Sequence, residues 1–489
     1  MSESDTPHLI IYDDREWVAE GLNRYTGMRR YGSLHVRGRS ARDHILAALP
    51  EWARHRMITI EPGANLDDPS TALPSMRKDS GVLIISARGA ALNPEALRQV
   101  VLRMHFAKTP VVDRIRNPLF VYYPKAEMLS DRWSDFREGP LHRLHEINDG
   151  AAELAGEPVL MDIGELPNLL KFIAGSTATR SFNEIRFDEL TYRKRSTNKP
   201  KMRAEHDFYG LIPASMKPWM AGAFDYREEG DFAEYSMLRY HFADSAFQWV
   251  HNAWTKKDFG EFLSRALFFL ESRAVREASR KEIETAAEDL FLDKVEARWR
   301  QMQADPAGAA LLNSIANMPG GERNIDAFSD YLNLARTKWK LLSRGKMVIG
   351  HGDPCLSNIL YDPATSTMKL IDPKGATSES ELWTHSLYDY CKLSHSILGD
   401  YDFINNAIFD VSLNENANYA LTLRRSAPVT YKQEFEEKVS KLQNLQMVRL
   451  GEASLFLSML PLHLDHPRKV VAFLLRARNI LDGLDISGT

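Results

Sequence analysis

The sequence predicts an α+β chain in which an N-terminal α/β domain precedes a two-lobed part. The length of 489 residues implies two or three folding units at about 150 residues per domain. Over roughly the first 160 residues, short apolar runs alternate with helical patterns, which is typical of an α/β domain. Strand-like runs follow, and after them helical periodicity dominates to the end of the chain.

The composition places the chain among ordinary globular proteins, with 44% hydrophobic and 26% charged residues. The 62 Lys and Arg residues nearly balance 66 Asp and Glu, so we expect no nucleic-acid partner. Cys355 and Cys391 are too few for a disulfide scaffold, which favours a reducing compartment. The most apolar C-terminal run, 453–464, is shorter than the ~20 residues of a membrane span. We therefore expect a cytoplasmic protein without an integral membrane segment.

Residues 1–160 are predicted to form the α/β domain. A helical pattern occupies 17–22, and Asn93 is a suitable N-cap for a helix that runs from Pro94 to about Phe106. The apolar runs predict strands at Leu9–Tyr12, Met57–Ile60, Gly81–Ser86 and Pro118–Tyr123.

Residues 165–240 are predicted to form a small lobe around a sheet, and residues 241–489 a mainly helical lobe. Tyr235–Tyr240 is expected to be the strand that links the lobes and to offer backbone groups to an adenine ring; a core strand is the alternative. The other predicted strands of the small lobe are Leu169–Ile173, Phe182–Phe187 and Leu190–Arg195. Helical periodicity is clearest at 259–270, 276–303 and 435–445.

The strongest chemical signal is the segment Val348–Leu360, followed by Met368–Pro373. Phosphoryl transfer requires a carboxylate beside the acceptor hydroxyl, and an amide oxygen and a second carboxylate for Mg²⁺. Asp353, Asn358 and Asp372 have these chemistries. The first two lie five residues apart on one loop, and an apolar strand leads to the third, so we expect all three to face one cleft.

This pattern, H-G-D-x-x-x-x-N at His351–Asn358 and then I-D at 371–372, resembles the aminoglycoside phosphotransferase and choline kinase superfamily, whose fold is protein-kinase-like. The resemblance implies that Asp353 is the catalytic base or the group that orients the hydroxyl. It also implies that Asn358 and Asp372 are the metal ligands and that His351 braces the loop. Turn and cap roles are the alternative for these residue types, but they do not explain the combined spacing.

Leu387–Leu393 resembles the D-x-x-K-L helix of capsule-associated phosphotransferases, which implies that Asp389 anchors the catalytic loop. An ordinary helix pair between Asp389 and Lys392, three residues apart, is the alternative.

A kinase also needs a cation on the nucleotide phosphates and a cover over them. The best cation is Lys194, with Glu205 as its partner. The alternative is a solvated basic hairpin, since Arg193, Arg195, Lys199 and Lys201 lie in the same stretch.

The predicted cover is the loop at 175–181, in which Ser176 and Thr177 would donate hydrogen bonds to the phosphates. It departs from the G-x-G-x-x-G pattern, and a plain Ser/Thr turn is the alternative.

Two further positions have residue types suited to chemistry but are not assigned a catalytic or metal-binding role. We interpret His463–His466 as a turn or the rim of a substrate pocket, because no distant metal-ligand partner is evident. Cys355 lacks a catalytic partner and is interpreted as a packing residue.

The N-terminal domain is faintly similar to nucleotidyltransferases and glycosyltransferases of the A class. Gly81–Ser86 corresponds to the strand that ends in a metal-binding Asp, yet this strand is followed by Ala87, Arg88 and Gly89. The resemblance therefore implies a degenerate domain. Asp13 and Asp14, the remaining early carboxylates, are interpreted as a turn at a strand end.

The sequence thus predicts a small-molecule kinase that uses ATP and Mg²⁺ to phosphorylate a hydroxyl, with a sugar or sugar derivative as the acceptor. The sugar assignment depends on the accessory domain and on the resemblance of 392–403 to the capsule or polysaccharide branch. One alternative is a pseudokinase that binds nucleotide and regulates a partner. The other is nucleotidyl or glycosyl transfer by the N-terminal domain.

Overall fold

The computed structural model describes residues 9–36, 38–68, 80–91, 93–104, 106–141, 150–154, 158–174, 183–413, 415 and 418–484. By its internal contacts the chain divides into two compact units, residues 1–178 and 179–489. Both units contain helices and strands, which confirms the predicted α+β class.

The first unit contains a six-stranded mixed sheet in the order β4-β1-β5-β8-β7-β9. β1 runs parallel to β4 and β5, whereas β8 is antiparallel to β5. Every residue of β1, β5 and β8 is buried, as expected for strands covered on both faces. The strands are β1 (Leu9–Asp13), β4 (Met57–Ile60), β5 (Val82–Ser86), β7 (Val111–Val112), β8 (Phe120–Tyr123) and β9 (Ala152–Glu153).

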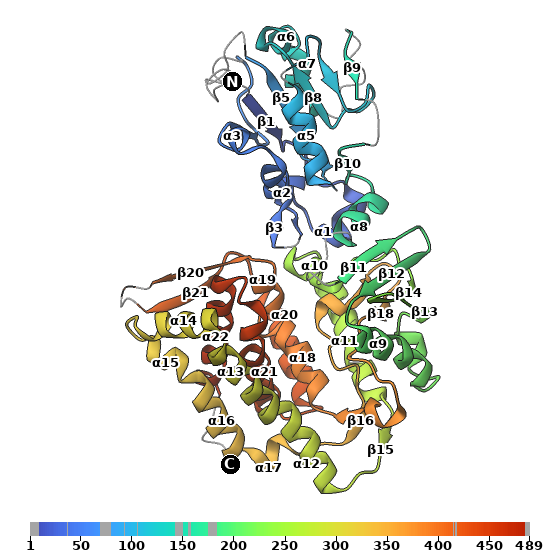
Figure 1. Ribbon diagram of the computed structural model, residues 1–489, viewed down its shortest axis with the longest axis vertical. Helices are drawn as coiled ribbons and strands as arrows, with labels where there is room; N and C mark the ends of the chain where they lie inside the picture. The colour runs from blue at the N-terminus through green and yellow to red at the C-terminus, as the bar shows by residue number, and fades with distance from the viewer. Residues whose placement is uncertain are drawn as a thin grey trace. The chain divides into compact units, whose positions relative to one another are not determined.

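Helices complete the core of the first unit. Trp133 and Phe136 of α7 share an apolar cluster with Leu9 and Ile11 of β1. Helix α5 lies across the sheet in Figure 1, and it begins at Pro94 as predicted. The predicted helical pattern at 17–22 forms only a short 3₁₀ turn before α1. The helices are α1 (Asn23–Thr26), α2 (Ala41–Ala48), α3 (Glu51–Arg54), α5 (Pro94–Met104), α6 (Ala126–Ser130) and α7 (Trp133–Glu138).

The segment predicted as a strand at Leu169–Ile173 is a helix, α8 (Leu166–Ala174). Its buried residues are 169, 170, 172 and 173, a spacing that forms one face of a helix and does not alternate as a strand would. Helix α8 packs against β10 (Met161–Asp162), which pairs with β6 (Gly89–Ala90). These contacts extend the first unit to residue 178, beyond the boundary that the sequence suggested near 160.

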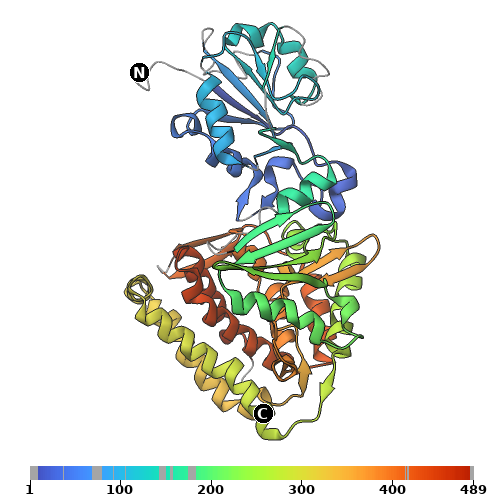
Figure 2. The same cartoon turned by 45° about the vertical axis from the view of Figure 1, so that its right-hand side comes forward.

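The second unit begins with a small lobe, a four-stranded antiparallel sheet in the order β11-β12-β14-β13. Helix α9 packs against this sheet, as Figure 2 shows. Asn198 caps α9 through its side chain, which accepts the Lys201 N–H, and Met202 and Tyr235 belong to the core between helix and sheet. The elements are β11 (Asn183–Phe187), β12 (Thr191–Ser196), α9 (Lys199–Leu211), β13 (Ala223–Glu229) and β14 (Phe232–Leu238).

The remainder of the second unit is mainly helical and shares one large apolar core. The run predicted at 276–303 is two helices joined by a π-helical turn, and the run at 435–445 is also interrupted, because α20 ends at Ser440 and Asn444 caps α21. The helices are α10 (Ser245–Val250), α11 (Lys256–Ser272), α12 (Arg280–Glu288), α13 (Lys294–Ala304), α14 (Pro306–Ala316), α15 (Gly321–Ile325), α16 (Ala327–Thr337), α17 (Trp339–Leu342), α18 (Tyr388–Ile397), α19 (Tyr401–Asn405), α20 (Val429–Ser440), α21 (Leu445–Met459) and α22 (Pro467–Asp482).

Short strands carry the segments of chemical interest. A hairpin of β17 and β18 follows the loop after β16, with Ile359 opposite Leu370. These strands are β15 (Val275–Arg276), β16 (Met347–Ile349), β17 (Ile359–Asp362), β18 (Thr367–Leu370), β19 (Trp383–His385), β20 (Phe409–Leu413) and β21 (Tyr419–Leu423). None of the helices in the described ranges has the length and apolar character needed to cross a membrane.

Candidate active site

The loop that follows β16 brings Asp353 and Asn358 into contact. The Asn358 amide nitrogen donates to the backbone oxygen of Asp353 at 2.9 Å and to its Oδ2 at 3.2 Å. Because the amide nitrogen is used within the loop, the amide oxygen is left to act as an acceptor or a metal ligand. The Asp353 side chain remains 40% exposed, so the carboxylate is accessible from solvent.

The hairpin places Asp372 beside this loop. The Ile371 N–H donates to the Asn358 carbonyl at 3.0 Å, so the residues that follow β18 continue along the end of the loop. Asp372 has a φ of 54°, in the left-handed region, where Asp is among the few side chains tolerated. Such backbone conformations cluster at functional sites.

Lys194 connects Asp372 to the small lobe. Its Nζ lies 2.7 Å from Glu205 Oε2 and 3.1 Å from Asp372 Oδ1. The Tyr235 hydroxyl donates to the same Glu205 oxygen at 2.9 Å. Burial lowers the pKa of Lys194, but the charges of Asp372 and Glu205 outweigh that effect and raise it, so the ammonium stays charged.

The basic neighbours of Lys194 take other positions. Lys199 pairs with Glu228, and the Arg195 guanidinium lies over the ring of Phe232 at 4.3 Å. Lys201 reaches Glu205 from the surface at 3.5 Å, four residues away on the same helix. Among these cations, Lys194 is the one within ion-pair distance of both Glu205 and Asp372.

Asp389 of α18 holds the start of the loop. Its carboxylate accepts the backbone N–H of His351 at 3.0 Å and of Gly352 at 2.9 Å, and pairs with Arg273 at 2.8 Å. Gly352 has a φ of 82° and a Cβ there would come within 2.6 Å of the Lys374 side chain, so this position requires glycine. The i,i+3 pair considered from the sequence is not formed, since Lys392 binds another carboxylate.

His351 is fully buried, and its Nδ1 accepts the Asp353 N–H at 3.3 Å. Burial lowers the pKa of His351 despite the carboxylates around it, which favours the neutral ring. The side chain therefore faces the inside of the loop, a placement that suits a brace better than a group that touches substrate.

Lys392, also on α18, lies 2.9 Å from Asp353 Oδ1. Burial raises the pKa of Asp353, but the Lys392 ammonium outweighs it and the net pKa is lowered, so Asp353 is ionised at neutral pH. From the sequence, Lys392 was considered only beside Asp389 and Tyr235 only as part of the strand that links the lobes, so their contacts with Asp353 and Glu205 were not predicted. The available signal was the spacing of Asp389 and Lys392, which puts both on one face of a helix.

The donor set fits Mg²⁺. This ion prefers oxygen ligands and is commonly held by one or two carboxylates together with substrate phosphates and waters. Asn358 and Asp372 would provide an amide oxygen and a carboxylate on adjacent backbone segments. No group of three or more His, Cys, Asp or Glu residues suited to a metal occurs in the parts of the chain that the structure describes.

Several predicted positions lie elsewhere. Ser176 and Thr177, with the rest of the loop at 175–181, lie outside the described residues. His466 pairs with its exposed neighbour Asp465, and the ring of His463 packs edge-on to Phe473. Cys355 is buried, and burial raises the pKa of its thiol well above the ordinary value, in line with a packing residue.

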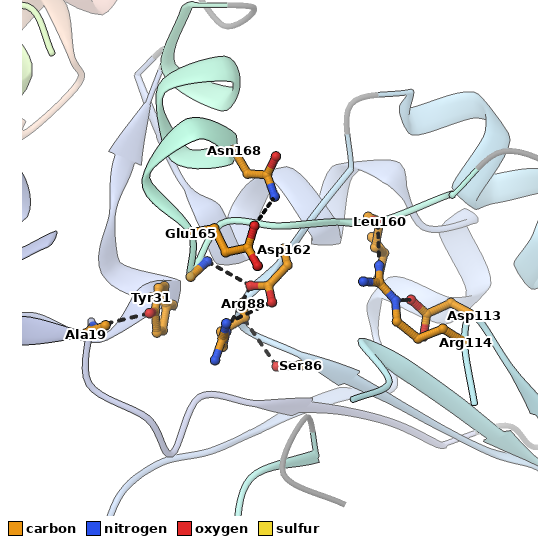
Figure 3. Close-up of polar contacts among 11 residues, drawn as sticks. Ala19, Tyr31, Ser86, Arg88, Asp113, Arg114, Leu160, Asp162, Glu165 and Asn168 are labelled. Atoms are coloured by element: carbon orange, nitrogen blue, oxygen red, sulfur yellow. Dashed lines mark hydrogen bonds and ion pairs between the residues drawn. The ribbon is translucent and has the colours of Figure 1, made fainter. Parts of the chain in front are cut away.

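In the first unit, an ion pair lies at the end of β5, where the resemblance to nucleotidyltransferases would place a metal-binding Asp. Arg88 follows β5 and binds Asp162 through two parallel hydrogen bonds of 2.9 and 2.8 Å, as Figure 3 shows. Asp13 is bound in the same way by Arg15. Asp14 accepts the Gly32 N–H, and burial raises its pKa to about 6. These carboxylates all have partners within the unit.

No protein-family model matches the sequence, and a search of curated proteins found no match. Solved structures do match. An aminoglycoside phosphotransferase, a thermostable mutant of APH(4)-Ia, is 12% identical and has a TM-score of 0.39, with 63% of this chain and 96% of that chain covered. The enzyme APH(3'')-Id from Streptomyces rimosus, in complex with ADP and streptomycin, is 14% identical over 61% of this chain and 98% of its own, with a TM-score of 0.30. The aminoglycoside-3'-phosphotransferase of type VIII is 11% identical over 55% of this chain and 92% of its own, again with a TM-score of 0.30.

Proposed function

We propose that this protein is an ATP-dependent phosphotransferase that moves the γ-phosphoryl group to a hydroxyl of a small molecule. The observation that carries the proposal is a continuous series of contacts from the small lobe to the catalytic loop. Lys194 pairs with Asp372, the backbone beside Asp372 binds Asn358, and the Asn358 side chain binds Asp353. A phosphate-binding cation, two oxygen ligands and a hydroxyl-orienting carboxylate are the groups that this chemistry uses.

Each group has one task in this mechanism. Lys194, kept charged by Glu205, binds the nucleotide phosphates. Mg²⁺ held by Asn358 and Asp372 would neutralise charge on the phosphates. Asp353 accepts a hydrogen bond from the acceptor hydroxyl and directs its oxygen at the γ-phosphorus. As the new P–O bond forms, the hydroxyl proton passes to the Asp353 carboxylate, the bond to the bridging oxygen breaks and ADP leaves. The protein contributes positioning and electrostatic stabilisation.

Within this proposal the acceptor is a sugar or sugar derivative. The support is the resemblance of residues 392–403 to capsule-associated phosphotransferases. This part of the proposal concerns the acceptor alone, and the transfer chemistry does not depend on it.

The test is ADP release from ATP and Mg²⁺ in the presence of sugars, amino sugars, choline and aminoglycosides, each assayed separately. We expect one class to stimulate release, and Asp353→Asn to abolish that stimulation because the amide is a weaker acceptor and can donate instead. Glu437→Gln, the same acid-to-amide change at a 71% exposed carboxylate of α20, is the matched control and should behave like the wild type. Equal stimulation of wild type and Asp353→Asn would refute the proposed role of Asp353.

Two other outcomes would favour the alternatives. ATP binding without release in any assay would favour a pseudokinase. Hydrolysis of a nucleotide sugar that is unaffected by Asp353→Asn would favour chemistry in the first unit, where Arg88 and Asp13 are now engaged in ion pairs.

A further inference from the structure

One face of α18 contacts the catalytic loop at three successive points. Asp389 accepts the N–H groups of His351 and Gly352, and Lys392 pairs with Asp353 at 2.9 Å. Farther along the helix, the Ser396 hydroxyl accepts the Leu356 N–H at 3.1 Å. Positions 389, 392 and 396 follow an i, i+3, i+7 spacing, so all three side chains lie on one side of the helix.

The middle contact differs from the other two because it reaches a side chain. Asp389 and Ser396 bind backbone N–H groups and so fix the path of the loop. Lys392 binds Oδ1 of Asp353, while Asn358 donates to Oδ2 of the same carboxylate. A donor on each oxygen, from two different directions, fixes the plane of the carboxylate. Each oxygen retains a lone pair, and the side chain is 40% exposed, so a hydroxyl can still bind.

The Lys392 side chain is itself held in place. It is only 14% exposed, and its ammonium lies 6.0 Å from the centre of the Tyr388 ring on the preceding turn. Both rotation of the side chain and exchange of its partner are therefore restricted, in contrast to an ion pair on an open surface, which contributes little.

We infer that Lys392 is a positioning residue of the transfer reaction, which holds the Asp353 carboxylate in the orientation that directs the acceptor hydroxyl at the γ-phosphoryl group. The inference rests on the proposed function. Displacement of a reacting group by about 1 Å can reduce the rate about 100-fold while the substrates still bind. Loss of Lys392 is therefore expected to lower kcat with little change in KM.

The test compares Lys392→Met, Lys392→Arg and Lys438→Met in the full-length protein. Lys392→Met keeps most of the side-chain volume and removes the charge, and we expect kcat to fall about 10- to 100-fold with the KM for ATP and acceptor within about twofold. Lys392→Arg keeps a donor and should recover part of the loss. Lys438→Met is the matched control, because that half-buried lysine of α20 pairs with Glu434 at 2.9 Å and should leave kcat unchanged.

An unchanged kcat in Lys392→Met would overturn the inference. So would a parallel loss in Lys392→Met and Lys392→Arg, or the same loss in Lys438→Met, since each would indicate a general effect on the fold. Should Lys392→Met fail to fold, Lys392→Gln takes its place with the same expectations, and thermal unfolding identifies that case.

Failure of the proposed function is a separate result. If the wild type shows no acceptor-dependent turnover, the proposed function fails, and crystal structures of wild type and Lys392→Met then test the positioning role alone. The inference predicts a different Asp353 side-chain conformation in the variant. The same conformation in both would overturn it.

Discussion

Lys194 carries its charge in a buried position because two carboxylates lie within hydrogen-bond distance of its ammonium. The pair with Glu205 is almost completely buried, whereas the Asp372 side chain is 38% exposed. Removing one partner of a buried pair is costly because the remaining charge is left without compensation, typically by about 3–5 kcal/mol. Because Asp372 is the exposed partner, its carboxylate is the one that can rotate toward a ligand.

We therefore expect Lys194→Met to weaken ATP binding at least tenfold, about 1.4 kcal/mol, and to lower thermal stability. Isothermal titration with ATP and Mg²⁺ measures the first effect and calorimetry the second. The double variant Lys194→Met with Glu205→Gln should recover stability and not binding. Lys199→Met, whose partner Glu228 is on the surface, is the control. Undiminished ATP binding by Lys194→Met would contradict this account.

At the scale of single residues, the sequence predicts that Asp353, Asn358 and Asp372 lie close together, but it does not predict all the residues that contact them. The spacing of Asp353 and Asn358, and the hairpin that leads to Asp372, are local, so their proximity follows from short-range structure. Lys392 pairs with Asp353 across 39 positions of the sequence, and nothing in its own segment distinguishes that partner from Asp389. Such long-range pairing depends on how α18 packs.

The helices around the site differ in whether their buried charged residues have hydrogen-bond or ion-pair partners. On helix α18, Asp389, Lys392 and Ser396 each have a partner in the catalytic loop. Helix α19 instead buries Asp402 completely, and burial raises the pKa of this carboxyl to about 8. The proton is therefore bound more tightly in the folded than in the unfolded protein, where an Asp titrates near 3.9. The stabilisation from this proton is complete below about pH 4 and is lost as the pH rises through about 8.

Asp402→Asn should therefore reduce the pH dependence of stability. Between pH 7 and 9 the wild type is expected to lose about 1.4 kcal/mol through this group, a loss that the amide cannot show because it does not titrate. Urea unfolding at several pH values, compared between the two proteins, measures the difference. Parallel curves for wild type and variant would mean that Asp402 is not protonated near neutral pH.

Several elements were predictable from the sequence. A short apolar run predicts the strand at Met57–Ile60, a cap predicts the helix that begins at Pro94, and the strand predicted at Leu190–Arg195 is Thr191–Ser196 in the structure. The segment at 169–173 was predicted wrongly as a strand, because a short apolar run suits both a strand and a buried helix. Its packing on β10 and the contact of Phe172 with His44 of α2 bury one face of α8.

At the scale of the whole molecule, the chain consists of two units, and Lys194, Glu205, Asp353, Asn358 and Asp372 all lie in the second. The order of sheet-rich and helix-rich segments was readable from the sequence. The end of the first unit was not, because α8 joins it through contacts with a strand pair that forms only in the folded protein. The two units have separate apolar cores among the described residues.

Separate cores imply that the first unit can be destabilised without affecting the chemistry of the second. Ile84→Ala removes a fully buried side chain from β5 and should cost about 2–5 kcal/mol in that unit. Calorimetry is expected to show a lower unfolding temperature for one transition, with ATP binding at 25 °C unchanged. Equal loss of ATP binding would show that the second unit depends on the first.

The most direct test of the central claim is to follow the label of γ-labelled ATP in the wild type and in Asp353→Asn, with the acceptor that gives the largest ADP release. The account predicts that the wild type transfers the label to the acceptor, and that the variant binds ATP but leaves the label on the nucleotide. Label that stays on ATP in the wild type, or that reaches the acceptor equally fast in both proteins, would contradict it.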